Sequence, residues 1–182
     1  MFAAALQDNP MATEPRIFRW TGSAWMTETI PTTKDMRAVW ADATQAFAVG
    51  VSDTIIRRSG ATWTLATVQN ANQTTLRGVY AIDASNIWVV GGGGSGASET
   101  NVAVYPPKVL FSANGTAFQP VAVPVTQRIL RSVWGSAAND AWIVGDDGTL
   151  LRWDGNAWTA VASPSLFSLR KVWGTGKNDV WA

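Results

Sequence analysis

Short apolar segments alternate with polar turns along this chain, and the clearest set runs from Leu130 to Ala162. Four β-strands are predicted in this unit, at residues 130–135, 141–145, 149–153 and 157–161. The second strand is apolar at every position from Ala141 to Val144, as in a sheet that is covered on both sides. The dipeptide Asp154-Gly155 predicts a tight hairpin between the last two strands. Equivalent pairs elsewhere are Thr21-Gly22, Ser59-Gly60 and Asn114-Gly115.

The same unit recurs, and each copy begins with Arg, any residue, Val and an aromatic residue. The aromatic members of this phrase are Trp40, Tyr80, Trp134 and Trp173. A repeat of about 40 residues that holds four short strands is typical of a β-propeller blade. We therefore predict an all-β chain, a β-propeller of four-stranded blades with about four repeat equivalents.

The repeat predicts a single propeller segment over residues 1–182. Its units are a partial blade at 1–35, blades at 36–74, 75–128 (with a glycine-rich insertion) and 129–167, and a partial blade at 168–182. Both ends fall inside a predicted second strand, so we expect the chain to be part of a larger propeller. Closure of four units into a ring, or pairing of two chains as a homodimer with eight blades, are the alternatives.

Three columns of the repeat are aromatic in every visible copy, and we expect them in the packed interior between blades. They are Trp40, Tyr80, Trp134 and Trp173 in the first strand; Phe2, Phe47, Trp88, Trp142 and Trp181 in the second; and Trp25, Trp63, Phe118 and Trp158 in the fourth. A fourth column, at the end of the third strand, holds Trp20, Arg58, Ser112 and Trp153. A buried position would not accept Arg and Ser so readily, so this column is expected to be exposed.

An arginine column is the strongest candidate binding feature, because Arg37, Arg77, Arg131 and Arg170 all begin a predicted first strand. If that strand is innermost, the four guanidinium groups would surround the mouth of a central channel and favour carboxylates or phosphates. The alternative is structural. Each arginine would pair locally with a backbone carbonyl or with an acid from the neighbouring blade.

Composition excludes several kinds of chemistry. The net charge is +1, which argues against a general nucleic-acid binder. The chain has no Cys and no His, so disulfides, thiolate chemistry and histidine-based triads are absent. We predict no cofactor and no metal site; the adjacent acids Asp146 and Asp147 are interpreted as a solvated turn, with a weak Ca²⁺ contact as the alternative. No apolar run reaches the length of a membrane span, and this segment shows no signal peptide.

The segment from Val133 to Val161 resembles the tandem repeats of bacterial secreted or surface β-propellers that are abundant in myxobacteria-like genomes. These repeats are similar to the blades of the photosystem II assembly factor propeller and to the Asp-box (BNR) repeats of sialidase-like propellers. The resemblance implies an extracytoplasmic location. It also implies an arginine-lined surface for protein binding, as in the assembly factor family. No sialidase catalytic set maps onto this sequence.

We conclude from the sequence that the chain is a non-enzymatic binding scaffold, since no general base with a tuned environment stands out. The expected partner is another protein, bound by the face that carries the loops Leu6 to Arg16 and Gly91 to Pro107, with the arginine column giving a preference for anions. The alternative is a carbohydrate-binding propeller, in which Trp20 and Trp153 would stack on a glycan.

Overall fold

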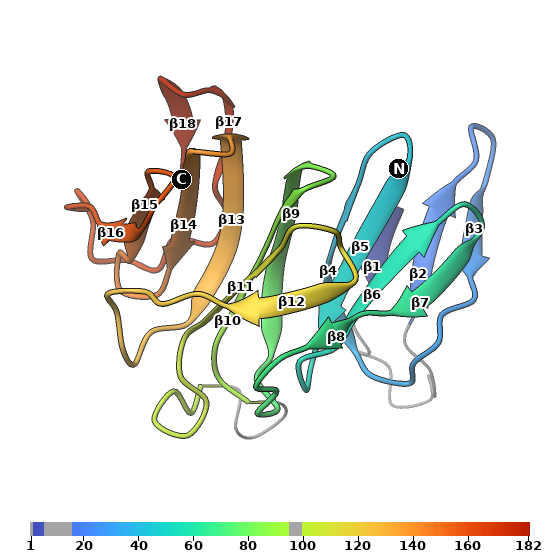
Figure 1. Ribbon diagram of the computed structural model, residues 1–182, viewed down its shortest axis with the longest axis horizontal. Coiled ribbons are helices and arrows are strands. Elements are labelled where there is room, and N and C mark those ends of the chain that lie inside the picture. Colours follow the sequence, from blue (N-terminus) through green and yellow to red (C-terminus); the bar gives the residue numbers. More distant parts are fainter. Residues whose placement is uncertain (1, 6–15, 95–99) are drawn as a thin grey trace.

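The computed structural model describes residues 2–5, 16–94 and 100–182, and these residues form strands, turns and loops without a helix (Figure 1). The strands form sheets that stand side by side in an open row, with the first and last sheets at opposite ends (Figure 1). Neighbouring strands run antiparallel in all but one pairing, as expected for chains that turn back through short hairpins. That the chain is part of a larger propeller stays a prediction, with closure of four units or of a homodimer as the alternatives.

Five sheets are formed by the described residues, and we call them the first to fourth blades and the last hairpin. The first blade contains β1 (Phe2–Ala5), β2 (Arg16–Trp20) and β3 (Trp25–Glu28). The second contains β4 (Met36–Ala41), β5 (Gln45–Gly50), β6 (Ile55–Ser59) and β7 (Thr62–Leu65). The third contains β9 (Leu76–Asp83), β10 (Asn86–Gly91), β11 (Lys108–Ser112) and β12 (Ala117–Pro120).

The fourth blade contains β13 (Leu130–Ala137), β14 (Asp140–Gly145), β15 (Leu150–Trp153) and β16 (Trp158–Ala160). The last hairpin contains β17 (Trp173–Gly176) and β18 (Asp179–Trp181). One short strand leaves its neighbours: β8 (Thr67–Val68) follows the second blade but pairs in parallel with β12, so it adds a fifth strand to the third blade. The glycines of the four predicted hairpin turns, Gly22, Gly60, Gly115 and Gly155, all have positive φ angles, which confirms those turns.

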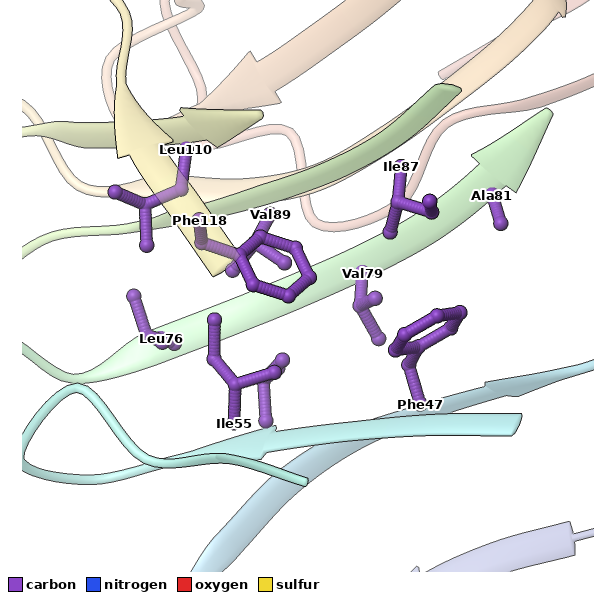
Figure 2. Packing of buried hydrophobic residues seen from close by; sticks show 10 residues of the cluster. Phe47, Ile55, Leu76, Val79, Ala81, Ile87, Val89, Leu110 and Phe118 are labelled. Carbon is purple, nitrogen blue, oxygen red and sulfur yellow. The ribbon is translucent and has the colours of Figure 1, made fainter. Parts of the chain in front are cut away.

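The hydrophobic core lies between successive blades. Phe47 and Ile55 of the second blade pack against Val79, Val89 and Phe118 of the third, and all five side chains are buried (Figure 2). A second cluster joins the third and fourth blades. The second, third and fourth blades, which we call the inner blades, are therefore covered on both faces, as the apolar pattern predicted. The first strands of successive units, β4, β9, β13 and β17, contact one another in series.

The aromatic columns are buried or half-buried in the second to fourth blades, with Trp40, Tyr80 and Trp142 half-buried, and they are exposed at the ends of the row. Among the described members, Trp25, Trp173 and Trp181 are 48%, 56% and 59% exposed, so the prediction of a packed interior is wrong for them. They belong to the first blade and the last hairpin, which occupy the two ends of the row (Figure 1). The prediction of an exposed fourth column is wrong for Ser112, which is 1% exposed. Its hydroxyl oxygen accepts the backbone N–H of Gly115 (2.9 Å), which makes burial of this polar group possible.

A buried ion pair links the second and third blades. Lys108, at the start of β11, donates from Nζ to Asp53 Oδ1 (2.8 Å) and to the backbone oxygen of Asn70 (3.2 Å). The second carboxylate oxygen of Asp53 accepts the backbone N–H groups of Asn72 (2.7 Å) and Thr74 (3.2 Å). Because both charges are buried and fully hydrogen-bonded, loss of either partner alone would leave an uncompensated charge at a cost of about 3–5 kcal/mol.

A carboxylate links the first and second blades. Glu28 of β3 accepts hydrogen bonds from Arg19 Nε (2.7 Å) within its own blade. It also accepts bonds from Arg58 Nε (3.1 Å) and Trp63 Nε1 (3.0 Å) of the second blade. Burial raises the pKa of this carboxyl group, but the three hydrogen bonds lower it by more, so its pKa lies below the ordinary value of 4.5.

In each inner blade the second strand ends in a glycine, and this glycine lies against the backbone of the residue that precedes the first strand. A Cβ on Gly145 would lie 2.3 Å from the backbone oxygen of Ile129, far inside contact distance. Gly50 and Gly91 make the same close approach in the second and third blades. Opposite each glycine the ladder shifts register, so one residue of the first strand has no direct partner and forms a β-bulge.

This geometry predicts that Gly145→Ala lowers the free energy of unfolding by more than about 2 kcal/mol, because the added methyl group has to displace backbone. Gly176→Ala is the matched control, since a Cβ there meets no atom within 4 Å. Urea denaturation followed by tryptophan fluorescence measures both variants. Equal loss of stability in the two variants would contradict the prediction.

The Glu28 cluster predicts a pH-dependent contribution to stability. A carboxyl group with a lowered pKa stabilises the folded chain above its unfolded-state pKa, and that contribution is lost as the pH falls through the folded-state pKa. Glu28→Gln should therefore cost about 2 kcal/mol at pH 7 and progressively less below pH 4.5. Denaturation curves between pH 3 and 7, about one unit apart, test this; a cost that stays constant with pH would show that charge is irrelevant.

Candidate functional site

The innermost strands line a groove with a volume of about 540 Å³, which we call the inner groove. Its walls come from β4, β9, β13 and residues 171–173, which lead into β17 and include its first residue. All four of the repeated first-strand phrases therefore contribute to the lining of the groove. This arrangement follows from the fold, since successive first strands lie next to each other.

Aromatic rings form one side of the inner groove. The rings of Trp40 and Tyr80 lie 6.0 Å apart between centroids in an edge-on arrangement. Those of Tyr80 and Trp134 lie 6.3 Å apart and are tilted. Burial raises the pKa of Tyr80, and a hydrogen bond with Trp134 lowers it by less. The pKa therefore lies above its ordinary value, and the phenol stays neutral at physiological pH. The row offers apolar faces and a neutral hydroxyl group to a ligand.

Positive charge forms the other notable feature. Arg37 and Lys171 line the groove, and no Asp or Glu is among the described residues that line it. Arg37 stands three positions before Trp40, the aromatic residue of its phrase, and Lys171 stands two positions before Trp173. The inner groove therefore combines cationic and aromatic surface along one path, a combination that suits a ligand with both acidic and apolar groups.

The arginines of the second to fourth blades lie at the β-bulges. The register skips Arg37, Arg77 and Arg131, and each follows the residue that pairs with Gly50, Gly91 or Gly145. A bulge re-aims the side chain of its extra residue relative to the strand. Three members of the arginine column therefore sit beside a close glycine contact, one in each of the second to fourth blades.

The predicted arginines have different surroundings. Arg77 Nε donates to the backbone oxygen of Gly92 (3.2 Å), and Arg131 makes two hydrogen bonds to the two carboxylate oxygens of Asp146. Both contacts lie within one blade, as in the structural alternative, although the acid comes from the same blade rather than its neighbour. Arg170 is exposed and precedes β17 instead of beginning a strand. Of the four, only Arg37 is among the described residues that line the inner groove.

The two predicted tryptophans lie in different blades and do not share a surface pocket. Trp20 ends β2 in the first blade, is 39% exposed and packs against Trp25 with 5.8 Å between ring centroids. Trp153 ends β15 in the fourth blade and is half-buried against Trp88, with 5.0 Å between centroids. Its column was expected to be exposed; contact with the third blade covers part of it.

The predicted loop face is described only in part. Residues 6–15 of the first loop lie outside the described residues, as do residues 95–99 of the second. The base of the second loop is anchored, because the backbone N–H of Thr75 donates to Gly93 O (2.8 Å) and that of Gly93 donates to Tyr105 O (2.9 Å). These contacts join the loop after strand two to the connection before strand one, so both emerge on one face, as predicted.

Sequence reasoning missed two sets of cations. Lys171 lines the inner groove although the repeat phrase drew attention to Arg170 instead. A further arginine column stands one position before the fourth column, on the third strand of three blades: Arg19, Arg57 and Arg152. The same repeat alignment that gave the fourth column contained this signal. In the described part of the chain, no three acidic side chains converge in a way that could hold a metal ion, and no helix is long and apolar enough to cross a membrane.

Comparison with known proteins places the fold. No protein-family model matches the chain, and no curated protein matches it either. A solved structure of YCF48 bound to D1 peptide has a TM-score of 0.59 and 20% sequence identity, over 79% of this chain and 44% of that one. A structure of YCF48 from Cyanidioschyzon merolae has a TM-score of 0.62 and 17% identity, over 91% of this chain and 56% of that one. The chain thus spans about half the length of these photosystem II assembly factors, and its fold is the predicted all-β propeller.

Proposed function

We propose that this chain is a non-enzymatic scaffold that binds an extended segment of a partner protein in the inner groove. The observation that carries the proposal is the composition of that groove. A row of aromatic rings runs beside two cations, and no acidic side chain is among the described residues that line it. The partner segment would place apolar side chains on the rings and acidic groups near Arg37 and Lys171.

The shape of the site favours a peptide over a compact small molecule. The groove runs across three adjacent strands and the approach to a fourth, so a ligand that follows it has to be extended. One of the similar solved structures, YCF48, is bound to a peptide. This likeness supports a protein partner in general and identifies no partner for the present chain.

The loop face and the location belong to the same proposal. Loops that leave a rigid scaffold on one face commonly add contacts to a bound partner, and the anchored base of the second loop lies beside Arg77. An extracytoplasmic location, as in the secreted propellers that the sequence resembles, would place this face where other proteins can reach it. A glycan site would need its own support, since Trp20 and Trp153 lie in separate blades.

We predict that the chain binds a fluorescein-labelled peptide of alternating Glu and Leu, and that it binds the matched Lys and Leu peptide at least about tenfold more weakly. Arg37→Gln and Lys171→Gln should each weaken binding of the acidic peptide about three- to tenfold and reduce its dependence on salt. Fluorescence polarisation at two salt concentrations measures these effects.

Arg170→Gln is the matched control, because it removes a neighbouring cation that does not line the groove. It should leave affinity unchanged. Equal loss from all three substitutions would indicate general attraction by charge, and unchanged binding in the Arg37 and Lys171 variants would place the peptide elsewhere.

A further inference from the structure

A second cleft opens between the third and fourth blades and shares no residue with the inner groove. Its volume is about 380 Å³. Aromatic residues from both blades line it, namely Trp88, Phe111 and Trp153, together with Asn86 at the start of β10 and Gly155 in the turn after β15. We call this site the aromatic cleft. The groove proposed above for a partner peptide does not account for it.

The aromatic cleft contains a departure from the repeat at Phe111. Strand pairing places an arginine opposite the second-strand aromatic residue in three blades: Arg19 opposite Phe2, Arg57 opposite Phe47, and Arg152 opposite Trp142. In the third blade the residue opposite Trp88 is Phe111. The third blade therefore lacks the guanidinium group that the equivalent positions of the other three blades contain.

The other blades show what the missing guanidinium does. The guanidinium carbon of Arg152 lies 5.2 Å from the ring centroid of Trp142, a cation–π contact. Arg57 Nη1 reaches the next blade and donates to the backbone oxygen of Asn114 (3.2 Å). The position above the second-strand aromatic residue is thus suited to a guanidinium group, and in the third blade the chain itself does not supply one.

The aromatic walls are held in place before any ligand binds. The indole Nε1 of Trp153 donates to the backbone oxygen of Ala138 (3.1 Å), which fixes the plane of the ring. Trp88 contacts both other walls, with centroid distances of 5.0 Å to Trp153 and 4.8 Å to Phe111. Phe111 and Trp153 remain partly exposed, so their surfaces are available to a ligand.

Two exposed carboxylates, of Asp83 and Asp154, adjoin the lining of the aromatic cleft, and we call them its rim. Asn86, which lines the cleft, donates from Nδ2 to both carboxylate oxygens of Asp83 (3.0 and 2.9 Å). Asp154 directly precedes Gly155 of the lining, and its carboxylate accepts the backbone N–H groups of Asn156 and Ala157, which lower its pKa. No Lys or Arg is among the described residues that line the cleft. Aromatic faces beside two exposed carboxylates complement a cation.

We propose that the aromatic cleft binds an arginine side chain presented by a partner protein. The guanidinium group would stack on the partly exposed rings of Phe111 and Trp153 and lie near Asp83 and Asp154. It would thus supply, from outside, the kind of group that the chain's own arginines supply in the other blades. A neutral sugar ring could stack on the same walls and hydrogen-bond to the two carboxylates, but it would form no ion pair with them. The cleft therefore recognises a basic partner segment, whereas the inner groove is suited to an acidic one.

The test uses the peptide acetyl-Gly-Arg-Gly-amide and its citrulline counterpart, in which a neutral urea replaces the guanidinium group. The ¹⁵N-labelled chain is titrated with each, and the indole N–H signals of Trp88 and Trp153 are followed by NMR. The arginine peptide should shift these two signals saturably, with a dissociation constant on the order of 1 mM, and the citrulline peptide should bind at least about tenfold more weakly. Equal binding of the two peptides, or unmoved Trp88 and Trp153 signals, would overturn the proposal, as would a shift produced by a neutral oligosaccharide alone.

Two variants locate the site. Phe111→Arg supplies the guanidinium group found in the other blades, and it should abolish binding of the arginine peptide while the acidic peptide still binds the inner groove. Asp83→Asn keeps the turn but removes the charge, and it should weaken arginine binding about threefold or more. Asp42→Asn is its matched control, since Asp42 holds the equivalent turn of the second blade. Equal effects of the two Asp variants would overturn the role of the rim.

Discussion

Each inner blade depends on one close backbone contact, between the glycine that ends its second strand and the carbonyl group that precedes its first. Only a residue without a Cβ permits this approach, and the amide that follows each glycine then donates to the same carbonyl: Val51 to Asp35 (3.0 Å), Gly92 to Thr75 (3.1 Å) and Asp146 to Ile129 (2.9 Å). The contact fixes the bulge, and the bulge directs the arginine. Further along the same strand, alternation places an aromatic residue at the groove. The same backbone constraint thus recurs in each of these blades, although only Arg37 of the three bulge arginines lines the inner groove.

The interfaces between blades have the same strand arrangement but are held together by different kinds of contact. Between the first and second blades, Glu28 bridges two arginines. Between the second and third, Arg57 reaches a backbone oxygen, and a Cβ on Gly115 would meet the ring of Phe47 at 2.7 Å, so little space is left there. Between the third and fourth, Phe111 and Trp153 leave a cleft. The repeat sets the position of each side chain, while single substitutions decide whether an interface is closed by charge, by packing or by an external group.

Much of the fold could be predicted from the sequence because repetition makes local signals visible several times over. The hairpin glycines and the apolar strands recur in phase, and the structure contains both. Side-chain partners were harder to predict. Nothing near Arg131 in the repeat phrase indicates that Asp146 binds it, since the bulge that aims the arginine appears only when strands pair. Lys108 and Asp53 stand 55 positions apart, and no local pattern relates them. Ser112 looked polar and exposed, yet the turn it supports requires its burial.

Because the short strand β8 pairs with β12, the second and third blades depend on each other more than the other blades do. In most repeat proteins each unit contacts its neighbours through a surface and can be copied or deleted as a module. Here a strand that follows the second blade completes the edge of the third, and the buried Lys108–Asp53 pair crosses the same boundary. Replacing either blade alone with another repeat would leave a strand edge unpaired and a buried charge without its partner. The second and third blades therefore form one structural unit, which is larger than the blade.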